Sequence, residues 1–317
     1  MGLLTRLATL SLVLAACAPE LDDPASRVTS RRVLAVRFEP AEAAPGTPVR
    51  AVALVADPAG VVDDVPVRWS WCDARPALAE LAPASPRCLV EGPWQRAAGD
   101  APRADTTLPD DACRRFGPDP PDQQGGADAR PVDPDVTGGY AVPMRAAVGD
   151  AAALAFARVR CNLAGVTREQ SVAWARLYRP NENPAFEALE RVDNAAGAPL
   201  ADGDTLTVTA GATVTLRARW PACTDDAPCG GAERYARFDP AARAIVTQRE
   251  AMRVSWYATG GRFRDVRTGR ARDDAATATD NVFTAPAAPG VYGVWVVLRD
   301  ERGGAAWRSL RVRVAGP

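Results

Sequence analysis

The stretch Val65-Pro-Val-Arg-Trp-Ser-Trp71 decides the fold class, and Met252-Arg-Val-Ser-Trp-Tyr257 repeats its pattern later in the chain. In both stretches, large apolar residues alternate with polar or small ones. A period of two places every second side chain on one face of a β-strand, whereas an amphipathic helix needs a period of ~3.6. We therefore expect both stretches to be strands with one buried face, and we expect Trp69 and Trp256 to point into the core.

The same alternation occurs elsewhere, most clearly in Thr213–Trp220 and Ser309–Val314. Alanine is abundant and favours helices by propensity, but β-branched residues and turn signals oppose it here. The chain contains 25 Gly and 28 Pro, which divide it into short segments. Short alternating strands between turn residues are typical of all-β sandwiches.

The strands form two copies of one plan. In the first copy, Ala155–Cys161 and Ser171–Tyr178 flank a turn, and in the second copy Val291–Arg299 and Trp307–Val314 do the same. Glycine in each turn supplies the positive φ that tight connections need. We therefore expect each copy to end in a β-hairpin.

The polar segment Arg179-Pro-Asn-Glu-Asn-Pro184 predicts the boundary between the copies, because its two prolines interrupt both sheets. It would act as a linker between a first domain at 32–178 and a second at 185–317. The first domain contains a long insert at 73–139 that is rich in Pro, Gly and Asp and poor in periodicity. We expect that insert to be irregular and tied by disulfides. A smaller insert spans 221–250.

Several motifs resemble PKD-like and other bacterial immunoglobulin-like domains. The segment from Pro289-Gly290 to Val314 resembles their last two strands, and Trp256 with Thr259-Gly-Gly261 resembles their central strand. The segment Leu34–Pro40, followed by Pro45-Gly46, is similar to their first strands. This resemblance implies two tandem immunoglobulin-like β-sandwiches. It transfers no catalytic residue, since these families have no general catalytic site.

The N-terminus carries an export signal. A short apolar run ends in Leu14-Ala-Ala-Cys17, which resembles the lipobox of bacterial lipoproteins. The resemblance implies a signal peptide at 1–16, lipidation of Cys17 and a flexible tether at 17–31. Ala18 in place of Asp implies sorting to the outer membrane by resemblance to the rule of enteric bacteria, with leaflet and facing side left open. The alternative is an ordinary signal peptide with a chance cysteine.

Six cysteines remain after Cys17, and an even number in an exported chain predicts disulfides. A zinc site is the alternative, but the spacing is unsuitable and the chain has no His. The immunoglobulin-like order implies that the strands before Cys72 and Cys161 are antiparallel neighbours, so these two cysteines would lie at opposite ends of the sandwich. Alternation also places them on opposite faces. We therefore expect Cys72–Cys88, Cys113–Cys161 and Cys223–Cys229.

Candidate ligand-binding residues are few. Trp69 and Trp256 could form sugar-stacking platforms, but core packing explains both tryptophans. Trp94 lies in the insert outside any strand pattern, which makes it the better surface candidate, although local loop packing also explains it. Asp133 and Asp135 begin a segment like a calcium loop. The twelfth position of such a loop should be Glu, but it is Met144 in this chain. A solvated loop is the alternative there.

The composition excludes several classes of function. Without His, the chain has no Ser-His-Asp triad, Cys-His pair or His-ligated metal. A net charge of −1 gives no basic surface for nucleic acid. We expect a noncatalytic envelope protein for binding, adhesion or scaffolding, without cofactor. It would contact the membrane through its lipid and bind an envelope protein or glycan. The alternatives are a carbohydrate- or calcium-binding module that uses the insert and, third, a carboxylate-dependent hydrolase.

Overall fold

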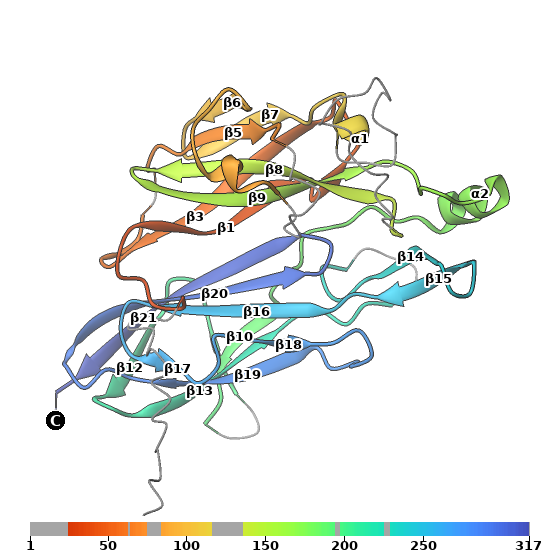
Figure 1. Ribbon diagram of the computed structural model, residues 1–317. Helices are drawn as coiled ribbons and strands as arrows, with labels where there is room; N and C mark the ends of the chain where they lie inside the picture. The colour runs from red at the N-terminus through yellow and green to blue at the C-terminus, as the bar shows by residue number, and fades with distance from the viewer. Residues whose placement is uncertain are drawn as a thin grey trace, which may run out of the picture.

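The chain folds into two β-sandwiches stacked one on the other (Figure 1). The computed structural model describes residues 25–62, 64–74, 84–115, 136–193, 197–224 and 229–316. Cys17, Asp133 and Asp135 lie outside the described residues. Within the described ranges, no helix is both long enough and apolar enough to cross a bilayer.

The first sandwich packs two sheets around Trp69 and Trp71, which are 2% and 3% exposed. One sheet has the order β1-β3-β4, with β7 also paired to β3. The other has the order β2-β9-β8-β5-β6. The strands are β1 (Arg32–Glu39), β2 (Glu42–Ala43), β3 (Pro48–Asp57), β4 (Gly60–Val61), β5 (Arg68–Cys72), β6 (Gln95–Asp100), β7 (Arg103–Thr107), β8 (Gly139–Val148) and β9 (Ala151–Arg160).

The second sandwich packs around Trp256 and Trp220, neither of which is exposed. Its sheets have the orders β11-β10-β13-β19-β17 and β12-β21-β20-β16-β18. The strands are β10 (Ala188–Arg191), β11 (Ala198–Leu200), β12 (Thr205–Thr209), β13 (Thr213–Arg219), β16 (Met252–Ala258), β17 (Arg262–Phe263), β18 (Arg267–Arg270), β19 (Ala278–Thr284), β20 (Gly290–Asp300) and β21 (Ala305–Ala315).

The two sandwiches share one immunoglobulin-like topology. In each, a short strand pairs in parallel with the last strand, β2 with β9 and β12 with β21. In each, the central strand pairs with the first strand of the closing hairpin, β5 with β8 and β16 with β20. The expected fold class is therefore confirmed, and so is the inward direction of Trp69 and Trp256.

The closing hairpin of the first sandwich differs from the expected one. It consists of β8 and β9, whereas Ser171–Tyr178, expected as its last strand, lies mostly in helix α2 (Arg168–Leu177). Thr167 starts this helix, because its side chain accepts from the Gln170 backbone while the Gln170 side chain accepts from the Thr167 backbone. The strand was expected from the match of this segment to Trp307–Val314. Only Trp174 of the helix is buried, whereas Val172 and Leu177 are 46% and 48% exposed.

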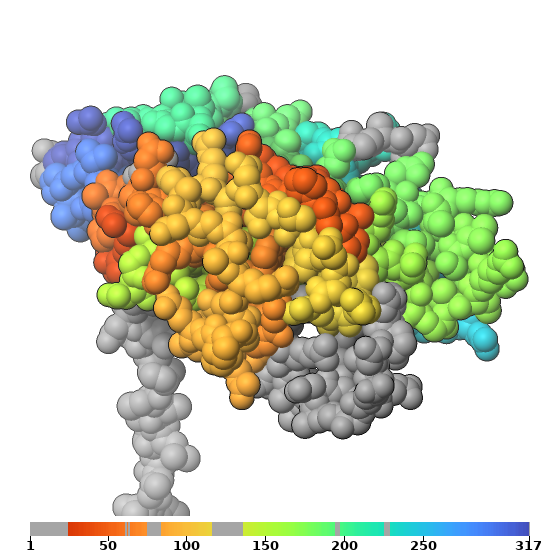
Figure 2. Space-filling view, turned by 90° about the horizontal axis from the view of Figure 1, so that it is seen from above, coloured from red at the N-terminus to blue at the C-terminus, as the bar shows by residue number. Residues whose placement is uncertain are grey.

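The insert at 73–139 is less irregular than expected. Its described part contains β6 and β7, which extend the two sheets of the first sandwich by pairing with β5 and β3. It also contains the 3-10 helix η1 (Pro86–Leu89) and the short helix α1 (Ala112–Arg115). This segment, orange to yellow in the space-filling view, forms much of the outer surface of the first sandwich (Figure 2). The insert at 221–250 contains a hairpin of β14 (Arg234–Asp239) and β15 (Ala244–Arg249), which contacts α2 beyond the edge of the sandwich (Figure 1).

Three disulfides join Cys72 to Cys88, Cys113 to Cys161, and Cys223 to Cys229, with Cα–Cα distances of 5.5, 5.7 and 5.5 Å. These are the expected pairs. Part of the expectation behind them was nevertheless wrong, because the strands before Cys72 and Cys161 are not antiparallel neighbours: β8 lies between them and pairs antiparallel with both.

Two features of this sheet still keep Cys72 and Cys161 apart. Trp71 is level with Ala155 across the sheet, so Cys72 is level with Phe156 and Cys161 lies five residues, ~17 Å, further along. That distance exceeds the ~7 Å limit for a disulfide. Cys72 also lies on the outer face, whereas Cys161 packs against the core.

Candidate functional site

The two sandwiches meet through an apolar contact. Leu34 and Leu54 of the first sandwich cluster with Trp295 and Val297 on the outer face of β20, and all four side chains are at most 6% exposed. Val28, which precedes β1, joins this cluster and donates its backbone N–H to the carbonyl of Ala258 in the second sandwich. Residues 26–28 of the expected flexible tether are therefore bound to the second domain. Burial of two large aromatic and aliphatic surfaces holds the domains together.

The linker is buried between the domains as well. Asn181 is 2% exposed, and its backbone N–H donates to Glu42 of the first domain over 2.8 Å while its side chain donates to Asp300 of the second over 3.3 Å. Asn183 donates to the Phe38 carbonyl and accepts from the Ala305 backbone. The polar residues at 179–184 thus bind both sandwiches and fix their relative position.

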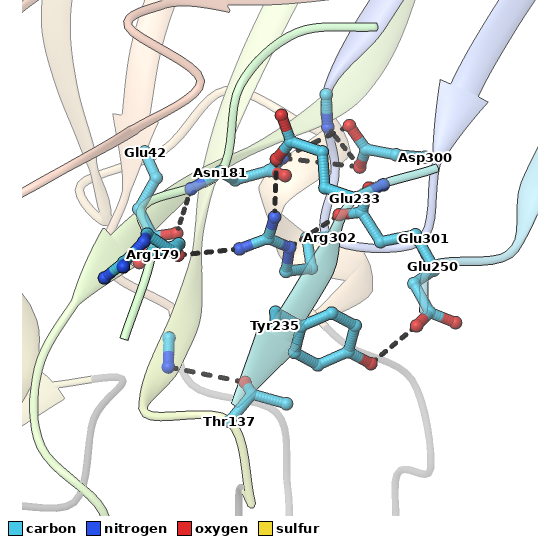
Figure 3. Close-up of polar contacts among 12 residues, drawn as sticks. Glu42, Thr137, Arg179, Asn181, Glu233, Tyr235, Glu250, Asp300, Glu301 and Arg302 are labelled. Atoms are coloured by element: carbon cyan, nitrogen blue, oxygen red, sulfur yellow. Dashed lines mark hydrogen bonds and ion pairs between the residues drawn. The ribbon is translucent and has the colours of Figure 1, made fainter. Parts of the chain in front are cut away.

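Buried charges surround this linker (Figure 3). The Glu42 side chain is fully buried and accepts from Arg158 over 3.0 Å and from the Tyr178 hydroxyl. Arg302, whose side chain is 3% exposed, donates to Glu250 over 2.5 Å and to Glu233 over 2.9 Å. It also donates to the linker carbonyl of Arg179 over 2.9 Å. We call the residues Glu42, Arg158, Asn181, Glu233, Glu250, Asp300 and Arg302 the junction cluster.

Burial determines the protonation of this cluster. It holds four carboxylates and two guanidiniums, so full ionisation would leave a net negative charge away from water. Burial raises the pKa of Glu250 to about 8, and it also raises the pKa values of Asp300 and Glu233. Arg302 opposes this effect by stabilising the ionised forms. Near neutral pH the folded cluster therefore holds at least one proton, on Glu250, that the unfolded chain would release.

A cleft opens beside the apolar contact, with a volume of about 730 Å³. Its first wall consists mainly of β3 and the segment that joins β4 to β5, with Arg103 of β7 at one side. Its second wall consists of Trp307, Ser309 and Arg311 of β21, together with Asp202 from the turn before β12. Trp307, Ser309 and Arg311 share the outward face of β21 because their positions differ by two. A cleft of this size lies within the ~300–1,000 Å³ typical of small-molecule sites.

Two polar arrangements organise the cleft. The Arg37 guanidinium lies over the Trp307 ring at 5.0 Å from its centroid and pairs with Glu39 over 2.6 Å. Asp202 accepts from the Ser309 backbone over 2.6 Å and from its hydroxyl over 3.0 Å. The first arrangement joins the two walls, and the second fixes side chains of the second wall before any ligand binds.

The residues predicted from sequence lie elsewhere. Trp94 donates its indole N–H to the carbonyls of Arg87 and Val90, and the Arg87 guanidinium lies over its ring at 5.7 Å. Its ring also packs against the cluster around the Cys72–Cys88 disulfide. A sugar-stacking role for Trp94 stays a prediction, as do the calcium ligands. Within the described part of the chain, no group of three or more acidic or cysteine side chains is placed to hold a metal ion.

Sequence reasoning missed the cleft residues because no motif marks them. Arg37, Arg103 and Arg311 are far apart in the chain, and arginines are common throughout it. The one available signal was Trp307, since an aromatic residue at an outward position of an alternating strand is unusual on a surface open to water. The junction cluster was equally hidden, because its acidic residues come from β2, from the two ends of the β14–β15 hairpin and from the end of β20.

Comparisons with known proteins give a weak likeness only. No protein-family model matches the chain, and no curated protein matches it. Among solved structures, fibronectin(III)-like modules of CbhA from Clostridium thermocellum match at 9% identity, with coverage of 92% of this chain and 93% of that one and a TM-score of 0.23. The C-terminal domain of AspA, an antigen I/II-family protein of Streptococcus pyogenes, matches at 9% identity, with coverage of 91% and 100% and a TM-score of 0.27.

A nucleoside hydrolase-related hypothetical protein from Saccharophagus degradans, associated with carbohydrate metabolism, matches at 16% identity and a TM-score of 0.21. This match covers 41% of the present chain and only 26% of the length of that protein. At such TM-scores these likenesses do not bear on function. The assignment of the fold depends on the strand order and register of the chain itself.

Proposed function

We propose that this chain is a lipid-anchored protein of the bacterial outer membrane that binds an envelope component without catalysis, in adhesion or scaffolding. The observation that carries the proposal is the cleft between two sandwiches that are held together by an apolar contact and a buried linker. A fixed pair of walls keeps binding side chains in place, so little conformational entropy is lost when a ligand binds.

Export has support of its own. Three disulfides are typical of proteins that fold in an oxidising compartment outside the cytoplasm. The lipobox-like Leu14-Ala-Ala-Cys17 fits the same route and adds a membrane anchor through Cys17. Two or three acyl chains bury enough methylenes, at about 0.8 kcal/mol each, for stable attachment to a bilayer.

The hydrolase alternative has less support. A carboxylate-dependent hydrolase needs an acid with a raised pKa facing its substrate. The carboxylates with raised pKa values, Glu233, Glu250 and Asp300, are 8%, 2% and 7% exposed and do not line the cleft. The acidic residues that do line it are Asp64 and Asp202. The calcium alternative depends on Asp133 and Asp135, which are outside the described residues.

The anchor is tested by replacing Cys17. We expect the parent protein to stay in the outer-membrane fraction and to incorporate a labelled fatty acid, whereas Cys17→Ala is exported without label into the soluble fraction. Equal membrane retention of the two proteins, with no label on either, would contradict lipidation.

The binding role is tested with that soluble Cys17→Ala protein. We expect it to bind isolated cell envelopes in a saturable manner and to be displaced by excess unlabelled protein. Binding that rises linearly with concentration and resists competition would count against a specific envelope ligand.

A further inference from the structure

The cleft is lined by two arginines that form no ion pair within the described residues. Arg103 and Arg311 line the cleft from its two walls, and neither guanidinium has an ion-pair partner among the described residues. Both side chains are exposed. The Nε atom of Arg37 is buried against Trp307 without a hydrogen-bond acceptor in the described part of the chain. Arg37 is paired with Glu39, so Arg103 and Arg311 are the two cleft arginines without an ion pair in the described part of the chain.

The same space also holds acceptors, which narrows the choice of ligand. Asp64 and Asp202 line the cleft with Ser309, so the two unpaired arginines share the space with two carboxylates. A densely charged anion would be repelled by the aspartates, and a neutral ligand would leave Arg103 and Arg311 without a direct ion pair. A ligand with one carboxylate and several hydroxyl groups satisfies both, because hydroxyls donate to the aspartates while the carboxylate accepts from the arginines.

The apolar part of the lining agrees with this chemistry. Val52, Val62 and Val65 line the first wall, and Trp307 lines the second. Sugar rings present C–H faces that pack on aliphatic and aromatic surfaces, while their edges carry the hydroxyls. An acidic peptide would bring carboxylates but no comparable set of hydroxyl donors for Asp64 and Asp202.

We propose that the cleft between the two sandwiches binds an acidic oligosaccharide, with a uronic-acid carboxylate held between Arg103 and Arg311. This inference rests on the proposed binding function and adds the chemical class of the ligand. The carboxylate would accept hydrogen bonds from Arg103 of the first domain and from Arg311 of the second. The ring that carries it lies against the valines, and its hydroxyls donate to Asp64 and Asp202.

The test uses the full mature chain carrying Cys17→Ala and isothermal titration with trigalacturonate as the probe. Cellotriose is the neutral control, and a tripeptide of glutamate is the acidic control without a sugar. We expect trigalacturonate to bind at submillimolar concentration, more tightly than either control by at least tenfold. Arg103→Gln and Arg311→Gln, one on each wall, should each weaken binding by at least fivefold. The matched control, Arg262→Gln, removes an exposed arginine that does not line the cleft and should leave binding unchanged.

Three results would overturn the inference: no heat of binding with trigalacturonate at 10 mM, equal affinity for the glutamate peptide, or unchanged affinity in both cleft variants. Unfolding midpoints of the variants show that each one is folded, which the exposure of both side chains leads us to expect. If the Cys17→Ala protein with its native cleft residues binds isolated envelopes but not trigalacturonate, only the proposed ligand class is wrong. If it binds neither, the proposed binding function fails as well.

Discussion

Replacing Glu250 with glutamine should remove most of the pH dependence of stability near neutrality. Glu250 is 2% exposed, and burial raises its pKa to about 8 from an ordinary value near 4.5. The folded state therefore holds this proton more tightly than the unfolded state does. The favourable contribution is fully present below the unfolded pKa and is lost as the pH rises through the folded pKa, so the free energy of unfolding should fall across this window.

The size of the effect follows from the same pKa. Each unit of difference corresponds to about 1.4 kcal/mol, so raising the pH from 5.5 to 9 should cost the wild-type protein ~3 kcal/mol. The chain has no His, so few other side chains titrate in this range. Asp300 and Glu233 shift in the same direction and add to the slope. Glu250→Gln keeps an oxygen that accepts from Arg302 but has no proton to lose, so its slope should be less than half that of the wild type.

The assay is urea unfolding followed by tryptophan fluorescence at several pH values between 5.5 and 9. Glu187→Gln is the control, because the Glu187 side chain is 51% exposed, and it should keep the wild-type slope. The reasoning would be refuted if wild-type stability rose with pH in this window. It would equally be refuted if Glu250→Gln lost as much stability as the wild type.

Two further predictions concern the domain contact and the disulfides. Trp295→Ala should lower the free energy of unfolding by about 3–5 kcal/mol, because this side chain is 1% exposed in the contact between the sandwiches; urea titration measures the loss. Replacing both Cys113 and Cys161 by alanine should cost ~4 kcal/mol, against ~2 kcal/mol for Cys223 with Cys229, because the closed loops span 48 and 6 residues. Equal thermal shifts in the two double variants would contradict the loop-entropy explanation.

Local patterns in the sequence were enough for the strands whose two faces differ in polarity. Val214, Leu216 and Ala218 alternate with polar residues, and all three are at most 5% exposed. The hairpin of β20 and β21 was expected almost to its ends for the same reason. Burial of one face selects a period of two, and that period can be read without knowledge of the neighbouring strands.

Local patterns failed in two segments of the first domain. Ser171–Tyr178 was expected as a strand because it matches Trp307–Val314 of the second copy, although Thr167 and Gln170 already formed the start signal of a helix. The strands β6 and β7 were missed because their residues are mostly polar or small and their faces differ little. Pairing with β5 stabilises β6, and pairing with β3 stabilises β7. Both partner strands are distant in sequence.

By itself, the sequence determined the all-β class, the inward tryptophans and the faces on which the cysteines lie, since each depends on neighbours one or two positions away. The tertiary structure alone decided which strands flank β8, which residues line the cleft and why Glu250 keeps a proton. Arg103 and Arg311 are more than two hundred positions apart, and nothing near either residue indicates the other. They share one space because the apolar faces around Leu54 and Trp295 must exclude water together, and burying those faces brings the two walls into opposition.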